Sequence, residues 1–396
     1  MNKQLAVVML MLLTTFIGFG IIIPVMPEII KEVDPGSLEL HTGLMLSIYS
    51  LISFLLSPIW GGLSDRIGRR PVILVGVLGF AASFLLFGIG ADSLPLMYAS
   101  RVLGGLFSGA VTSVIVAYVA DVTTPEERTK GMGLVGMSIG LGFTIGPGFG
   151  GLLSKISLET PFYAAAGLAF ITFLLSFTRL HESLPLEKRR TKTVKRPSRW
   201  HAFAGPVRYL YVMAFFVAFS LASLEATLQL FGMRRFEVTP GQVGMMFFVC
   251  GLVGALIQGG VVRRFIRKGD EPKFIVMGLV ISAAGFILLA TSHELWTATI
   301  YLAIFGIGNA LIRPCVTSLV TQKTTVGQGV ASGLSSSMDS LGRIIGPLAG
   351  TFMFTFNIEL PYLIGGVLSL AGILLLIRFN TIDSAAGGAS RTEASS

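Results

Sequence analysis

Apolar segments long enough to cross a membrane recur along the whole chain of 396 residues. A spanning helix needs about 20 mostly apolar residues, and charged side chains are costly within the bilayer. Hydrophobic residues make up 53% of the chain and charged residues 13%, whereas soluble proteins carry about 25% charged residues. The sequence therefore predicts an integral membrane protein.

Twelve such segments are present, and none shows the ten-residue alternation of barrel strands. We predict an all-α membrane protein with twelve transmembrane helices. The predicted spans are residues 5–28, 42–60, 71–91, 95–120, 131–153, 161–179, 209–231, 241–262, 274–291, 295–320, 329–354 and 361–378.

The basic residues predict the orientation of these helices. Most of the 30 Lys and Arg residues fall at the termini and in the even-numbered connections, and only Lys31, Lys155, Arg234 and Arg235 fall on the other side. Positive residues stay cytoplasmic, so we expect a multi-pass protein of the plasma membrane with both termini in the cytoplasm. The net charge of +9 is then explained by topology and by contact with anionic membrane lipids, without a nucleic-acid partner.

The polar segments divide the chain into four predicted parts. Residues 1–180 form an N-terminal six-helix bundle, and residues 208–380 form a C-terminal one. Residues 181–207 form a basic cytoplasmic linker between them. Residues 381–396, which include the run "SAAGGASRTEASS", are predicted to be a disordered cytoplasmic tail.

The two bundles repeat one another at an offset of about 200 residues. The matches are "GFTIGPGFGG" at Gly142 with "GRIIGPLAG" at Gly342, "ETPFY" at Glu159 with "ELPY" at Glu359, and "GGLSDRIGRRP" at Gly61 with "GGVVRRFIRKGDEP" at Gly259. Their common order predicts two parallel six-helix repeats, an arrangement that suits a transporter with a site between its halves.

These motifs resemble those of the major facilitator superfamily. The signature of its loop between spans 2 and 3 is matched by Gly61, Leu63, Ser64, Asp65, Arg66, Gly68, Arg69 and Arg70. The run "GLGFTIGPGFGG" looks like the antiporter signature of its drug:proton exporters. The runs "SRVLGG", "VADVTTPEER" and "LIRPCVTSL" resemble Gram-positive multidrug exporters of the NorA and Bmr type. The resemblance implies the major facilitator fold, proton-coupled drug export and a monomer.

The motif at Gly61 predicts a conformational latch formed by Asp65, Arg66, Arg69, Arg70 and Asp121. By the resemblance, Asp65 faces the positive N-terminal dipole of a helix in the other half. Arg69 is placed to pair with Asp121 at the end of span 4. Such contacts would exist only while the cytoplasmic side is closed. The alternative is a solvated turn whose arginines merely follow the positive-inside rule.

The antiporter motif consists of Gly142, Gly146, Pro147, Gly150 and Gly151. Small residues at helical spacing allow two helix backbones to approach closely, and a proline removes one backbone hydrogen bond. The motif could therefore bend span 5 and seal a leak pathway. Ordinary small-residue packing is the alternative.

Glu225 lies midway along span 7 and is the first candidate for proton coupling. A carboxylate held away from water has a raised pKa and can exchange a proton near neutral pH. A structural glutamate paired with an arginine of another helix is the alternative.

Four further polar residues complete the predicted proton-coupling and cavity set. Asp339 is either a proton relay or the local partner of Arg343, four residues later. Arg101 and Arg313 resemble basic residues that the exporters carry in spans 4 and 10. Asn309 stands where exporters of the NorA type have an aspartate, which puts a two-carboxylate mechanism in doubt.

The predicted substrate cavity combines these polar groups with flexible apolar side chains of the kind that promiscuous binding sites use. Its candidates are Glu225, Asn309, Arg313, Arg101, Phe16, Phe19, Met137, Phe143, Phe231 and Met338.

These patterns predict a secondary active multidrug efflux transporter that exchanges protons for hydrophobic or cationic compounds by alternating access. An exporter of one solute, such as a sugar, a metabolite or one antibiotic class, is the alternative. We expect no enzymatic activity, no cofactor and no metal, because the sequence has no nucleotide-binding loop and its four histidines lack metal-ligand spacing. The expected partners are small drug-like molecules, protons and membrane lipids.

Overall fold

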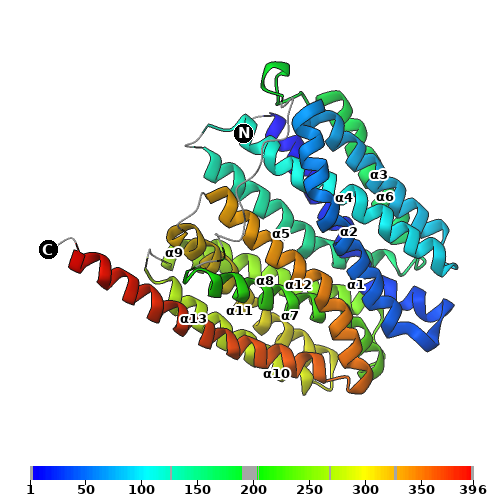
Figure 1. Cartoon of the computed structure of the whole chain (residues 1–396). Helices are drawn as coiled ribbons and strands as arrows, with labels where there is room; N and C mark the ends of the chain where they lie inside the picture. The colour runs from blue at the N-terminus through cyan, green and yellow to red at the C-terminus, as the bar shows by residue number, and fades with distance from the viewer. Residues whose placement is uncertain are drawn as a thin grey trace. The chain divides into compact units, whose positions relative to one another are not determined.

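The computed structural model describes residues 3–124, 127–189, 203, 205–266, 269–324 and 328–393. These residues form twelve long helices and no strand (Figure 1), so the predicted all-α membrane fold is confirmed. The long helices are α1 (Lys3–Val33), α2 (Leu38–Ile67), α3 (Arg69–Ile89), α4 (Leu94–Val122), α5 (Arg128–Leu153), α6 (Thr160–Arg179), α7 (Arg208–Arg235), α8 (Pro240–Leu256), α10 (Glu271–Ala290), α11 (Leu295–Lys323), α12 (Gln328–Phe356) and α13 (Leu360–Glu393). A π-helical segment, Ile257–Val262, joins α8 to the three-residue helix α9 (Arg263–Phe265).

Among the described residues, eleven helices are both long and apolar enough to cross a membrane. The helix α12 has 29 residues, but it carries three consecutive serines, Asp339 and Arg343. A spanning helix keeps such groups away from lipid, toward protein or water. The composition of α12 therefore marks it as a helix that lines the inside of the protein.

The structure corrects the predicted tail. Residues 381–393 continue α13 as a helix, although they were expected to be disordered. Alanine is the best helix former and no proline interrupts the segment. An ion pair of 2.6 Å between Lys323 Nζ and Asp383 Oδ2 also ties its first turn to α11. Most of the predicted linker, residues 190–202 and 204, lies outside the described residues.

The chain forms two compact units that divide α7 and α8 between them. The first unit contains Met1–Val194 and Glu225–Gly251, and the second contains Lys195–Leu224 and Leu252–Ser396. Ala226 explains why the C-terminal part of α7 joins the first unit, because it is buried in a core cluster with Ile22 and Val25 of α1. The predicted bundle boundaries at residues 180 and 208 follow the sequence repeat and stay predictions.

In the first unit, α1 lies beside α5, α2 beside α4, and α3 beside both α4 and α6 (Figure 1). Two buried clusters fill the space between these helices. One contains Met26, Phe84 and Phe162. The other contains Val111 and Tyr118.

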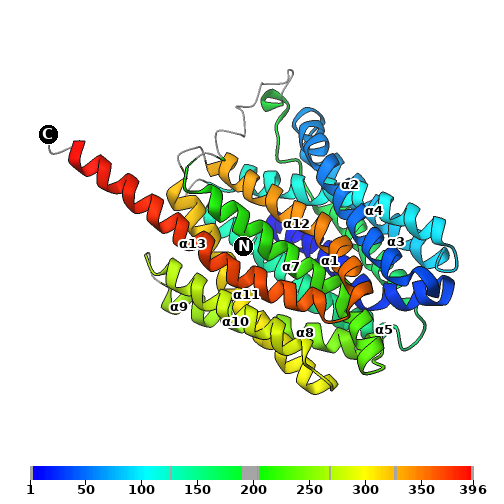
Figure 2. The ribbon, with the colours of Figure 1, turned by 60° about the horizontal axis from the view of Figure 1, so that its bottom comes forward.

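In the second unit, which Figure 2 shows from another side, α10 packs against both α11 and α13. A buried cluster joins Tyr211 of α7, Leu279 of α10, Ile312 of α11, Leu334 of α12 and Phe379 of α13. Each unit therefore has its own apolar core.

Glycines bring α5 into backbone contact with α1. A Cβ atom on Gly146 would lie 2.6 Å from the carbonyl oxygen of Ile17, and one on Gly150 would lie 2.6 Å from that of Ile21. Real Cβ atoms essentially never come this close to another atom. The predicted close approach is thus observed, and α1 is the helix that approaches.

The second repeat uses the same arrangement. A Cβ atom on Gly342 of α12 would lie 2.6 Å from the backbone nitrogen of Phe219 in α7, and one on Gly346 would lie 2.6 Å from the carbonyl oxygen of Phe219. Helices 5 and 11 of the twelve therefore pack in equivalent ways against the first helix of their own repeat. This equivalence supports the two parallel repeats seen in the sequence.

We expect Gly146→Ala to lower the melting temperature of the detergent-purified protein by several degrees. The methyl group must displace α1, and overpacking of this kind costs about 1–3 kcal/mol. Gly136→Ala is the matched control on the same helix, because a Cβ atom there meets nothing within 4 Å, and alanine favours the helix by about 1 kcal/mol. Equal melting temperatures for the two variants would contradict the packing argument.

Candidate substrate and proton site

Glu225 lies in α7 with only 8% of its surface exposed. One turn later on the same face, Gln229 donates a hydrogen bond from Nε2 to Glu28 Oε1 of α1, at 3.3 Å. Cys250 of α8 lies close enough to interact electrostatically with Glu225. The carboxylate is thus buried within the protein, in the neighbourhood of α8.

Three of the predicted cavity aromatics form a continuous chain of rings. The Phe16 and Phe143 ring centroids are 5.2 Å apart, and those of Phe143 and Phe19 are 5.4 Å apart. Phe19 continues the chain to Tyr49 of α2, at 5.3 Å. All four rings are partly or fully buried. The structure therefore brings these side chains of α1, α2 and α5 into one apolar surface.

Arg101 of α4 lies against this chain, with only 2% of its surface exposed. Its guanidinium carbon is 4.8 Å from the ring centroid of Phe87, 5.6 Å from that of Phe84 and 6.0 Å from that of Tyr49. Nη2 donates to Ser100 Oγ at 3.1 Å, while Nε finds no hydrogen-bond acceptor among the described residues. Cation–π attraction from the three rings stabilises this buried charge.

The other apolar candidates have different surroundings. Phe231 is fully buried in α7, edge-on to Phe236 and 5.8 Å from the guanidinium carbon of Arg235. Met137 of α5 is 54% exposed. Met338 of α12 is partly buried against the core of the second unit.

In the second unit, Asp339 forms an ion pair with Arg313. The distance from Arg313 Nη2 to Asp339 Oδ2 is 3.3 Å, and both side chains are more than a third exposed. Asp339 thus pairs with a residue of α11, and its pairing with Arg343, four residues later on its own helix, stays a prediction. Asn309 is partly buried one turn before Arg313 on α11.

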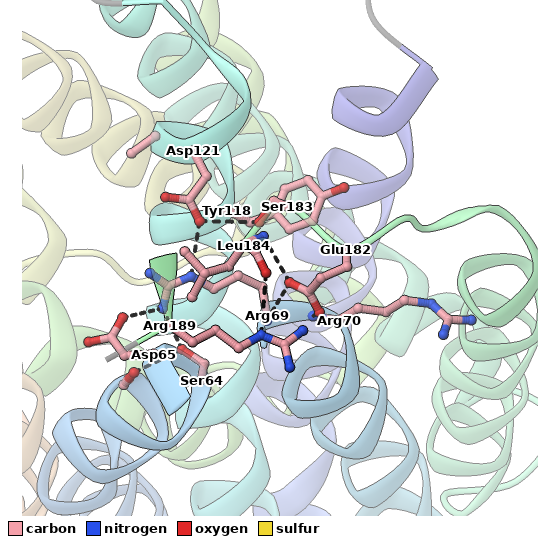
Figure 3. A network of polar contacts seen from close by, with 12 residues as sticks. Ser64, Asp65, Arg69, Arg70, Tyr118, Asp121, Glu182, Ser183, Leu184 and Arg189 are labelled. Atoms are coloured by element: carbon pink, nitrogen blue, oxygen red, sulfur yellow. Dashed lines mark hydrogen bonds and ion pairs between the residues drawn. The ribbon is translucent and has the colours of Figure 1, made fainter. Parts of the chain in front are cut away.

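Asp65, Arg69 and Asp121 of the predicted latch meet at one end of the first unit (Figure 3). Arg69 Nη1 lies 2.7 Å from Asp65 Oδ1, and Arg69 Nε donates to Asp121 Oδ2 at 3.0 Å. The predicted contact between Arg69 and Asp121 is therefore present. Arg70 turns away from them, donates to the carbonyl oxygen of Phe177 at 2.7 Å and stacks on its ring.

Arg66 lies in the last turn of α2. The predicted contact of Asp65 with a helix of the other half stays a prediction.

At the opposite end of the first unit, the structure reveals polar contacts that the sequence motifs did not indicate. Arg234 of α7 forms an ion pair with Glu39 of α2. Together with the bond between Gln229 and Glu28, it ties the C-terminal part of α7 to α1 and α2. Glu225, Gln229 and Arg234 follow one another at intervals of four and five residues, which is a helical spacing and indicates one side of α7. A single sequence does not say which helix that side faces.

Asp34 and His41 form a second cluster at this end. His41 lies 3.2 Å from Asp34 Oδ2 and 2.8 Å from the hydroxyl of Tyr98. Desolvation raises the pKa of Asp34, but hydrogen bonds from His41, Ser37 and Gly36 outweigh it, so the pKa lies below its usual value. Within the described part of the chain, no group of His, Cys, Asp and Glu side chains could hold a metal ion.

The family model described as "Major Facilitator Superfamily" matches residues 8–324 and 267–394. The chain belongs to the major facilitator superfamily. This superfamily consists of membrane transporters rather than enzymes.

Curated relatives agree with the predicted subgroup of this superfamily. The chain is 31% identical to "Multidrug resistance protein 2" of Bacillus subtilis over 94% of both chains. It is 29% identical to "Quinolone resistance protein NorA" of Staphylococcus aureus, over 95% of this chain and 96% of NorA. The resemblance to exporters of this type is confirmed.

Solved structures of the superfamily share the fold. The human organic anion transporter MFSD10 (TETRAN) superposes with a TM-score of 0.72 and 27% identity, over 95% of this chain and 99% of that one. A bacterial homologue of the human lysosomal transporter Spinster, in an inward-facing and unoccupied conformation, gives a TM-score of 0.70 at 18% identity, over 96% of this chain and 95% of that one.

We expect Arg101→Lys to destabilise this facilitator even though the charge is kept. Lysine has a compact, strongly hydrated ammonium group and cannot stack a planar cation on Phe87, so the cost should be about 2 kcal/mol. The measurement is the melting temperature in detergent, with the exposed Arg179→Lys of α6 as the matched control. An unchanged melting temperature for Arg101→Lys would show that the aromatic surroundings of Arg101 do not stabilise it specifically.

We expect Glu39→Arg and Arg234→Glu each to slow transport, and the double reversal to recover most of the loss. Each single change places like charges together, and the exchange restores an attractive pair with a coupling of about 1–3 kcal/mol. The assay is substrate transport by membrane vesicles. Asp92→Arg, a charge reversal at an exposed residue between α3 and α4, serves as the control. If the double variant loses as much transport as the two single variants together, Glu39 and Arg234 do not act as a functional pair.

Proposed function

We propose that this chain is a proton-driven multidrug exporter of the plasma membrane that exchanges protons for hydrophobic or cationic compounds. The observation that carries the proposal is the enclosed carboxylate of Glu225, midway along a membrane-spanning helix. The names of the curated relatives, multidrug resistance and quinolone resistance proteins, support the substrate class.

Glu225 supplies the coupling in this proposal. A carboxylate in a membrane-spanning helix costs about 2.5 kcal/mol or more when it is charged and uncompensated. Binding of either a proton or a cationic substrate removes that cost, so the two compete for one site. A proton taken up from outside then releases the substrate, and loss of the proton to the cytoplasm restores the charged site.

The aromatic chain supplies the binding surface. Phe16 and Phe19 of α1 and Phe143 of α5 offer ring faces on stretches of these helices that contain no charged residue. Such faces attract flat apolar molecules and cations without requiring one exact shape. Arg101 borders this surface at Tyr49, whose ring centroid is 6.0 Å from the guanidinium carbon.

A second titrating carboxylate is not required. Asn309 cannot exchange a proton near neutral pH, and Asp339 is compensated by Arg313. We therefore assign the coupling to Glu225, with Asp339 as the second candidate. The latch of Asp65, Arg69 and Asp121 would close the cytoplasmic side in a monomer whose two termini are cytoplasmic.

An exporter of a single organic solute is the second candidate. It is favoured by the similarity to the human organic anion transporter MFSD10, at 27% identity over nearly the full length of both chains. Arg313 is a partly exposed cationic group within a spanning helix that an anionic solute could approach. This candidate predicts transport of an organic anion and no transport of cationic dyes.

The test is transport of ethidium by purified protein in liposomes with an imposed pH gradient. We expect Glu225→Gln to lower gradient-driven transport at least about tenfold, because the amide can neither bind a proton nor attract a cation. Glu237→Gln, an exposed residue between α7 and α8, is the matched control and should keep the wild-type rate.

Three outcomes separate the candidates. Loss of gradient-driven transport in Glu225→Gln alone, with the dye still bound, supports the proposal. Full gradient-driven transport by Glu225→Gln removes Glu225 from the coupling role and makes Asp339 the next variant. If wild-type protein transports an organic anion but no dye, the single-solute proposal replaces the multidrug proposal.

A further inference from the structure

We propose that Glu182 is a positioning residue of the latch. The segment Leu180–Leu184, here called the strap, holds α3 and Arg69 in the geometry that the ion pairs of the latch require. The inference rests on the proposed function, because the latch is part of that cycle. Glu182 belongs to none of the motifs that the sequence indicated, and it lies 113 residues from the turn that it contacts.

The turn between α2 and α3 consists of one residue, Gly68. Its φ angle is +107°, in the region that favours glycine, and its N–H donates to the carbonyl oxygen of Ser64 at 3.1 Å. A Cβ atom at this position would also collide with the carboxylate of Glu182. Glycine at this position therefore leaves room for Glu182 to approach the start of α3.

Glu182 caps α3. The backbone N–H of Arg69 donates to Glu182 Oε1 at 2.8 Å, and that of Arg70 donates to Oε2 at 3.1 Å (Figure 3). The first N–H groups of a helix have no partner within the helix, and they carry the positive end of its dipole. One carboxylate therefore satisfies two of them and stabilises the start of α3.

The cap and the latch meet at Arg69. Its backbone is held by Glu182, while its side chain bridges Asp65 and Asp121. The next strap residue, Ser183, donates from its hydroxyl to Asp121 Oδ2 at 3.2 Å, which is the same oxygen that Arg69 contacts. The strap thus fixes both sides of the ion pair between Arg69 and Asp121.

The strap is itself anchored to α1 and α4. Tyr118 of α4 donates to the carbonyl oxygen of His181 at 2.8 Å, and the N–H of His181 donates to Gln4 Oε1 at 2.9 Å. Leu180 is buried, and the N–H of Leu184 donates to Glu182 Oε1 at 3.0 Å, which holds the carboxylate in place. These bonds make the strap a fixed support for the latch.

The first measurement is hydrogen exchange of the peptide that contains Arg69 and Arg70 in the full-length protein. We expect Glu182→Ala to speed exchange of these two amides at least about tenfold, because their acceptor is removed. Glu182→Asp, which keeps both oxygens on a shorter side chain, should exchange at an intermediate rate. Glu187→Ala, an exposed glutamate five residues later, is the matched control and should not change exchange.

The second measurement reports the latch without any drug. Ser64, whose hydroxyl accepts from Arg69 Nη1 at 2.6 Å, is fully buried. In a Cys250→Ala, Cys315→Ala background, we expect Glu182→Ala to raise the alkylation rate of Ser64→Cys by a maleimide about fivefold. In liposomes, the maximal rate of ethidium transport should fall about fivefold with KM within twofold.

The outcomes test the two proposals separately. Faster exchange and alkylation in Glu182→Ala, with partial rescue by Glu182→Asp, support the positioning role, and they do so even if wild-type protein moves no dye and the export proposal fails. Unchanged exchange, or unchanged alkylation despite faster exchange, overturns the positioning role. The positioning role is also overturned if wild-type protein transports ethidium and Glu182→Ala transports it at the same maximal rate per folded transporter.

Discussion

Close contact between helix backbones at glycines is the interaction on which the packing of both repeats depends. In a membrane the helices gain little from leaving lipid, so dispersion contacts between closely packed backbones must hold them together. Gly146 and Gly150 supply this contact between α5 and α1, and Gly342 and Gly346 supply it between α12 and α7. Because the same device occurs twice, it places the first helix of each repeat, with its candidate site residues, against a rigid neighbour.

The opposite face of α5 also uses small residues. A Cβ atom on Gly151 would lie 2.8 Å from the Cα atom of Gly241 in α8. The antiporter motif therefore packs α5 between α1 and α8 within the first unit. This arrangement places Phe143 of α5 next to the rings of α1 and on the helix that contacts α8. Packing and the proposed binding surface thus share one helix.

Three charged side chains in the first unit are stabilised by different kinds of partner. Arg101 lies among aromatic rings, Arg69 between two carboxylates, and Glu182 on the N-terminus of a helix. An aromatic face is a fixed partner that no change of protonation removes, whereas carboxylate partners weaken when they bind protons. We therefore regard Arg101 as a permanent part of the scaffold and the Arg69 cluster as a contact that a transport cycle can break.

The sequence by itself determined the helical membrane fold, because repeated apolar segments of about 20 residues leave few other structures in lipid. It also determined the repeat, the superfamily and the pair of Arg69 with Asp121, because these depend on local motifs. Only the tertiary structure decided four other features: the helical continuation of α13, the aromatic surroundings of Arg101, the pair of Arg234 with Glu39 and the cap from Glu182. The last three are contacts between separate segments of the chain, and a helical pattern places a residue on a face without saying what that face meets.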